Sequence, residues 1–120
     1  MEEMPKKPLI LVVDGHADIQ ELLRLILEDQ GFDAITASDG KSALELFKTH
    51  QPHAVLTAEH LADMTALDLL ASVRGAQSPH SVCPVVVLAE RSDSYDEFHA
   101  AIARPQGFRH LVATLKQILA

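Results

Sequence analysis

The sequence predicts a single α/β domain built on a parallel sheet, and three features of the chain support this class. Short apolar runs, of which Leu9–Val13 is the first, alternate with segments whose apolar residues recur at helical spacing. This alternation is typical of βαβ units, whose strands are buried on both faces. The 120 residues suit one domain, and no repeat or low-complexity tract divides them. We therefore expect one domain over residues 1–120, with a flexible segment at 1–7.

The expected elements follow one another without long connections. Apolar, largely branched runs mark strands at 9–13, 32–37, 54–57 and 85–88. Apolar residues at helical spacing mark helices around 19–27, 43–47, 66–73 and 108–119, and the natural stops are Gly31, Pro52 and Gly75. Right-handed crossovers place such helices on both faces of the sheet. Ligands and chemistry then collect at the carboxyl ends of the strands, which here are Asp14, Thr57–Ala58 and Ala89–Glu90.

Composition excludes several classes of function. The formal net charge is −7, and no run of basic residues is longer than Lys6–Lys7. This balance argues against nonspecific binding of nucleic acid or of an anionic membrane, because both need clustered positive charge. No apolar stretch approaches the ~20 residues of a membrane span, and the first residues lack the apolar core of a signal peptide. The lone Cys83 excludes an internal disulfide, so we expect a cytoplasmic protein.

Four segments together resemble the receiver domains of bacterial response regulators (CheY-like). They are 11–14 with the helix closed by Gly31–Phe32, then 39–46, 52–57 and 83–88. Each segment is generic alone, but their order and spacing are specific, and the likeness runs from about Leu9 to Leu119. The resemblance implies a flavodoxin-like, doubly wound parallel sheet of five strands in the order 2-1-3-4-5.

Receiver domains carry out one reaction, and the resemblance shows where this chain departs from it. In the family, an Asp ending the third strand accepts a phosphoryl group from a histidine kinase, and two acidic residues after the first strand hold Mg²⁺. A Thr or Ser and a Lys contact the phosphoryl oxygens. These roles fall on Ala58, on Asp14 with Gly15, on Ala89 and on Arg104. Only Asp14 keeps the family residue. Phosphotransfer is therefore not expected, and Mg²⁺ binding should be lost or weak.

Neighbours of this pocket leave alternatives open. Glu59 lies one residue past the acceptor position, so it is either a fixed negative charge near the pocket or a solvated loop residue. Phosphorylation at a displaced acid, Glu59 or Asp63, is a second alternative. His16 and His60 should lie near the same rim as Asp14 and Asp63. These are plausible zinc ligands, but they lack a tight ligand spacing, so the sequence favours surface histidines over a metal or small-ligand sensor.

The segment between Ala89 and Arg104 is several residues shorter than the family pattern. Ser94 and Glu97 have the spacing of a helical capping box. Topology, however, requires a strand to return to the carboxyl edge before the last helix begins. We therefore expect a shortened fourth helix near 93–98 and a short fifth strand at about 100–103.

The sequence thus favours a pseudo-receiver, which binds a protein partner without phosphorylation and is not an enzyme. Its partner-binding face would surround the shortened helix, the fifth strand and the last helix. That face would mediate homodimer formation or docking of another protein, and nucleic acid would not be bound by this domain itself. The candidate contacts are Tyr95, Phe98, His99, Arg104, Phe108 and Arg109, although for Phe98 and Phe108 the sequence favours a core position over a contact. A remaining alternative is the regulatory domain of a larger response regulator or hybrid kinase.

Overall fold

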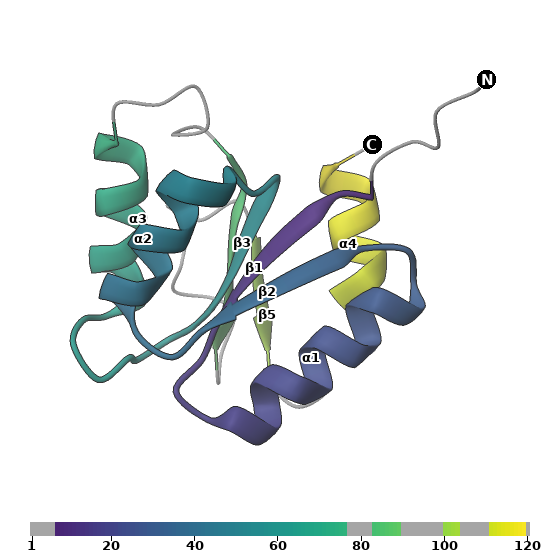
Figure 1. Cartoon of the computed structure of the whole chain (residues 1–120), viewed down its shortest axis with the longest axis horizontal. Coiled ribbons are helices and arrows are strands. Elements are labelled where there is room, and N and C mark those ends of the chain that lie inside the picture. The colour runs from purple at the N-terminus through teal and green to yellow at the C-terminus, as the bar shows by residue number, and fades with distance from the viewer. Residues whose placement is uncertain (1–6, 77–82, 90–99, 104–110, 120) are drawn as a thin grey trace.

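Five parallel strands form one sheet in the order β2-β1-β3-β4-β5 within the residues that the computed structural model describes, which are 7–76, 83–89, 100–103 and 111–119 (Figure 1). The strands are β1 (Leu9–Val13), β2 (Asp33–Ala37), β3 (Ala54–Ala58), β4 (Val85–Ala89) and β5 (Ala100–Ala103). The helices are α1 (Ala17–Asp29), α2 (Gly40–His50), α3 (Ala66–Gly75) and α4 (Leu111–Ile118). The expected α/β class with a parallel sheet is confirmed. The shortened helix expected near 93–98 and residues 1–6 of the N-terminal segment lie outside the described residues.

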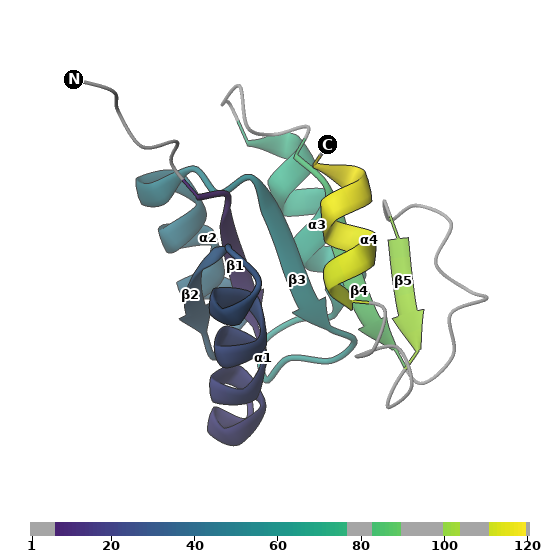
Figure 2. The ribbon, with the colours of Figure 1, turned by 90° about the vertical axis from the view of Figure 1, so that its right-hand side faces the viewer.

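Helices cover both faces of the sheet, with α2 and α3 on one side and α1 and α4 on the other (Figures 1 and 2). Because successive side chains of a strand point to opposite faces, β1 supplies both cores. Leu11 and Val13 pack with α2 and α3, whereas Ile10 and Val12 pack with α1 and α4. All four side chains are buried, which explains why β1 is a continuous apolar run. No helix in the described ranges is long and apolar enough to span a membrane.

The end of α1 corrects one expected boundary. Phe32 does not belong to β2, which begins at Asp33. The backbone N–H of Phe32 donates to Leu27 O at 3.0 Å, and Gly31 N–H donates to Glu28 O at 3.3 Å. Gly31 has φ of +92°, so these contacts form the left-handed cap that commonly ends helices. The Phe32 ring is then buried beside Leu27. Its apolar character reflects this cap and not strand pairing.

The ends of α2 are fixed by local side-chain and backbone contacts. Asp39 precedes the helix, and its carboxylate accepts the Ser42 backbone N–H at 2.8 Å. At the other end Gln51 has φ of +50°, and its N–H donates to Phe47 O at 3.0 Å. Pro52 follows directly and cannot continue a helix. These contacts explain where α2 begins and ends.

Candidate functional site

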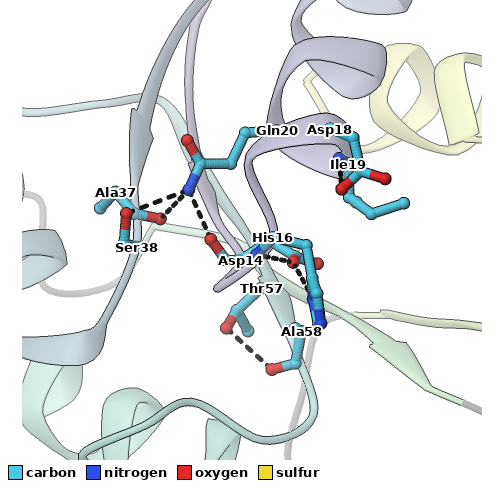
Figure 3. Close-up of polar contacts among 9 residues, drawn as sticks. All are labelled: Asp14, His16, Asp18, Ile19, Gln20, Ala37, Ser38, Thr57 and Ala58. Carbon is cyan, nitrogen blue, oxygen red and sulfur yellow. Dashed lines mark hydrogen bonds and ion pairs between the residues drawn. The ribbon is translucent and has the colours of Figure 1, made fainter.

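The carboxyl ends of β1, β3 and β4 lie side by side and define the candidate site. Val13 is in register with Thr57, and Thr57 is in register with Val87. Asp14 follows β1 directly, and Ala58 is the last residue of β3. Figure 3 shows Asp14, Thr57 and Ala58 close to one another at this edge. The structure thus brings together the two positions on which the expected acceptor and metal-binding roles fall.

Asp14 is the buried acidic group of the site, with a relative exposure of 1%. Its Oδ1 accepts the backbone N–H of His16 at 2.8 Å and lies 3.1 Å from His16 Nδ1. The His16 side chain is 77% exposed, and Figure 3 shows its ring next to the Asp14 carboxylate. A carboxylate oxygen that already faces two nitrogen groups is less available to a cation.

Gln20 connects this edge to β2, a role that no pattern in the sequence indicates. Its Nε2 donates to Asp14 O at 2.6 Å and to Ser38 Oγ at 3.2 Å, and it lies 3.5 Å from Ala37 O. The side chain comes from the first turns of α1 and ties the loop after β1 to the end of β2 (Figure 3). It positions the backbone of Asp14 and does not face the acceptor position.

The acceptor position offers no nucleophile. Ala58 is 8% exposed and presents only a methyl group. The preceding hydroxyl, Thr57 Oγ1, is fully buried and donates to Ala58 O at 3.0 Å. Glu59 is half-buried, and its backbone O accepts the Ala66 N–H at 2.9 Å. Nucleophilic attack on a phosphoryl group requires an oxygen with a free lone pair at this place, which a methyl group cannot supply.

The donor set around Asp14 does not fit Mg²⁺. This ion prefers octahedral geometry with hard oxygen ligands, of which the protein usually supplies carboxylates. The residue beside Asp14 is Gly15, and the residue across on β3 is Ala58. Among the residues that the structure describes, no group of three or more His, Cys, Asp or Glu side chains is arranged to hold a metal ion.

Asp63 and His60 were expected near the rim with Asp14, and the structure places them in other contacts. Both carboxylate oxygens of Asp63 accept backbone N–H groups at the start of α2. His60 forms an isolated antiparallel bridge with Thr65 in the loop before α3. Their positions therefore do not support a zinc site formed by Asp63 and His60 with Asp14 and His16.

Several sequence-predicted residues lie outside the described part of the chain. These are Arg104 and the partner-face candidates Tyr95, Phe98, His99, Phe108 and Arg109. The backbone of Ala89 is described as the end of β4, in register with Ala103 of β5. The strand β5 occupies the range where the returning strand was expected.

Fold and edge geometry together define the class of protein. The model of the response regulator receiver domain family matches residues 10–110. The chain belongs to this family. Receiver domains of response regulators are regulatory domains that interact with other proteins.

Individual relatives and structures agree with this assignment. The chain is 34% identical over 115 residues to the transcriptional regulatory protein KdpE of Mycobacterium tuberculosis, which covers 90% of this chain and 49% of that protein. It is 33% identical over 87 residues to the DNA-binding response regulator MtrA of Mycobacterium leprae, covering 72% and 37%. The chain thus spans half or less of these curated relatives. The chemotaxis response regulator CheY4 of Vibrio cholerae shares the fold, with a TM-score of 0.85, 22% identity and coverage of 95% and 100%.

Proposed function

We propose that this chain is a pseudo-receiver, a receiver domain that binds a protein partner without being phosphorylated. The observation that carries the proposal is the methyl group of Ala58 at the carboxyl end of β3, next to the buried Asp14. In receiver chemistry the acceptor is a carboxylate, and no other group on β3 can replace it because Thr57 is buried and hydrogen-bonded to the backbone.

The surroundings of Asp14 support loss of the metal as well. His16 supplies nitrogen contacts to Asp14 Oδ1, at the position where a hard cation would need an oxygen-rich shell. Gly15 brings no second carboxylate. Without Mg²⁺, the negative charge of a phosphoryl donor would face the Asp14 carboxylate directly, and this repulsion opposes phosphotransfer.

Displaced phosphorylation at Asp63 is a weaker proposal. Its two carboxylate oxygens accept the N–H groups of Gly40 and Lys41 at 2.8 and 3.0 Å. Attack on a phosphoryl group would require one oxygen to leave its donor. Glu59 is the other candidate acid, and its place just after Ala58 keeps it as the site to map if any adduct appears.

Two surfaces are candidates for partner binding. The first is the face expected from the sequence around Tyr95, Phe98 and Arg109, which lies outside the described residues. The second is α1, where Leu22 and Leu25 are 42% and 54% exposed. These two leucines are three residues apart and so lie side by side on the helix. Four acidic residues and one Arg accompany them on α1, so this helix suits a partner with positive charge and not a second copy of itself.

Self-association through the first face is the expected outcome, and three single variants test it. Tyr95→Ala, Phe98→Ala and Arg109→Glu should each weaken homodimer formation by tenfold or more. Aromatic residues and Arg are enriched in interfaces, and Tyr and Arg are enriched among the few interface residues whose truncation costs ~2 kcal/mol or more. Analytical ultracentrifugation measures the self-association, and partner pull-down is run beside it. Both should be the same with and without acetyl phosphate and Mg²⁺.

Matched variants on the described helices identify the surface if the first face is wrong. The pair Leu22→Glu and Leu25→Glu changes α1, and Leu67→Glu changes a leucine of similar exposure, 47%, on α3. Circular dichroism confirms folding in every case. Wild-type association in all three variants of the first face, together with loss in the α1 pair alone, would move the binding surface to α1.

The share of KdpE and MtrA that the match covers supports a further proposal, on the kind of system in which this domain acts. The match covers 49% of KdpE and 37% of MtrA, so each of these proteins extends beyond the part that is similar to this chain. We propose that this domain acts in a two-component or related regulatory system, either by itself or as the regulatory part of a larger protein. The sequence of the surrounding reading frame decides between these forms.

A further inference from the structure

The loop between β3 and α3, residues 59–65, is fastened to the start of α2. Asp63 Oδ1 accepts the backbone N–H of Gly40 at 2.8 Å, and Oδ2 accepts that of Lys41 at 3.0 Å. The first N–H groups of a helix have no acceptor inside the helix. Asp63 therefore satisfies two donors of α2 that the helix itself leaves open, across a sequence separation of 23 and 22 residues.

Packing reinforces this contact on the same two residues. Met64 lies against Gly40 so closely that a Cβ added to Gly40 would overlap the Met64 side chain. Within the loop, Leu61 N–H donates to Met64 O at 2.9 Å. The loop is thus closed on itself while its Asp63–Met64 tip sits on the first turn of α2.

The two ends of the loop are fixed by other contacts. On the side of β3, Glu59 O accepts the Ala66 N–H at 2.9 Å. On the side of α3, Thr65 and Asp68 form a reciprocal capping box, with distances of 3.1 and 3.2 Å. These end contacts stay within the loop and α3, whereas the contacts of Asp63 and Met64 join the loop to α2.

We propose that Asp63 is a positioning residue that fastens the 59–65 loop to α2, so that the protein itself, and not a phosphoryl group or a metal ion, fixes the backbone beside Ala58. This inference deepens the pseudo-receiver function and rests on it for its biological meaning. The geometry of the fastening is independent of that function.

The fastening depends on the charge of Asp63. The N–H groups of Gly40 and Lys41 hold the pKa of the Asp63 carboxyl below its usual value. When the pKa of a carboxyl is lower in the folded state than in the unfolded state, the carboxyl stabilises the protein at pH values above its unfolded-state pKa. That contribution is lost as the pH falls through the lower, folded-state pKa. The fastening is therefore complete at neutral pH and is released only in acid.

Other charged groups near the contact have separate partners or positions. Asp39 caps the same helix through Ser42, and Lys41 is exposed. From the loop and α3, the nearby groups are His60, which is exposed, and Asp68, which binds Thr65. Asp39 is an acid that also contacts α2, so a variant of Asp39 is needed beside the variant of Asp63.

Amide hydrogen exchange of the whole chain, followed by NMR, tests the proposal at the Gly40 and Lys41 amides, which donate to Asp63. In the wild type the amides of Gly40 and Lys41 should be protected, and their proton shifts should follow one titration with a midpoint below that of an ordinary Asp. Asp63→Asn should abolish this titration and speed exchange at both amides about tenfold, since charge-assisted hydrogen bonds are roughly twice as strong as neutral ones. The amide of Glu59 should shift as well, because the loop is released.

Asp68→Asn is the matched control, since it makes the same chemical change at the other end of the loop. It should alter Thr65 and leave Gly40 and Lys41 unchanged, and Asp39→Asn should leave the low titration at Gly40 in place. Equal exchange of Gly40 and Lys41 in the wild type and in Asp63→Asn would overturn the proposal. No phosphodonor or metal is present, so this failure would leave the pseudo-receiver function itself untouched.

Discussion

Replacing both Gly15 and Ala58 by Asp is expected to give this chain the ability to take a phosphoryl group from acetyl phosphate in the presence of Mg²⁺. The double change supplies the nucleophile and a second carboxylate beside Asp14. There is room for it, because a Cβ on Gly15 would meet only Ser38 O, at 3.7 Å. Ala58→Asp alone should stay unmodified, since the metal site would still have one carboxylate. Intact mass after incubation measures the adduct.

Binding of Mg²⁺ gives the double variant a second, independent signal. Its crowded carboxylates should lower stability in the absence of metal, because like charges in one site repel. At a free Mg²⁺ concentration about ten times the Kd, binding should restore about 1.4 kcal/mol. Thermal unfolding with and without Mg²⁺ measures this shift, which the wild type should lack.

The Asn pair, Gly15→Asn with Ala58→Asn, is the control for shape without charge. It should take no phosphoryl group and gain no stability from Mg²⁺. Equal phosphorylation of Ala58→Asp and of the double Asp variant would contradict the account, because it would show that Asp14 alone can hold the metal.

Phe47→Ala is expected to destabilise the domain by about 3–5 kcal/mol, the usual cost of removing a buried aromatic ring. Phe47 is 1% exposed and is among the largest fully buried side chains. It anchors α2 in the core that includes Leu11, Val13 and α3. Since domains of this size are stable by only about 5–15 kcal/mol, the variant should unfold at a much lower urea concentration.

Lys48→Ala is the neighbouring control, because Lys48 is exposed on the same helix. Its free energy of unfolding, measured in urea, should stay within about 0.5 kcal/mol of the wild-type value. A loss below about 1 kcal/mol in Phe47→Ala would show that α2 is held by other contacts than this ring.

The centre of the sheet was predictable because the described side chains of β1, β3 and β4 are almost all buried, on both faces of the sheet. The runs at β1, β3 and β4 are continuous and apolar, and such runs are visible without any knowledge of the fold. The predicted start of β2 at Phe32 was wrong because a residue buried in a helix cap and a residue buried in a strand are both apolar. The local sequence does not separate these two causes.

The candidate site was predictable only where its residues follow strands. Asp14 and Ala58 could be placed at one edge, since parallel strands bring their carboxyl ends together. The roles of Gln20 and Asp63 could not, because their partners lie 6 to 23 residues away in the chain and are mostly backbone atoms. Almost every residue has a backbone donor and acceptor. The residue type at the partner position therefore does not show that its backbone receives such a contact.

The most direct measurement of the central claim is the intact mass of the unaltered protein after incubation with acetyl phosphate and Mg²⁺, with a receiver that has the acceptor Asp treated in parallel. The reference should gain one phosphoryl group, and this chain should keep its mass, because Ala58 has no nucleophile and Gly15 leaves Asp14 without a second carboxylate. One phosphoryl group on this chain, mapped to Glu59 or Asp63, would contradict the pseudo-receiver account.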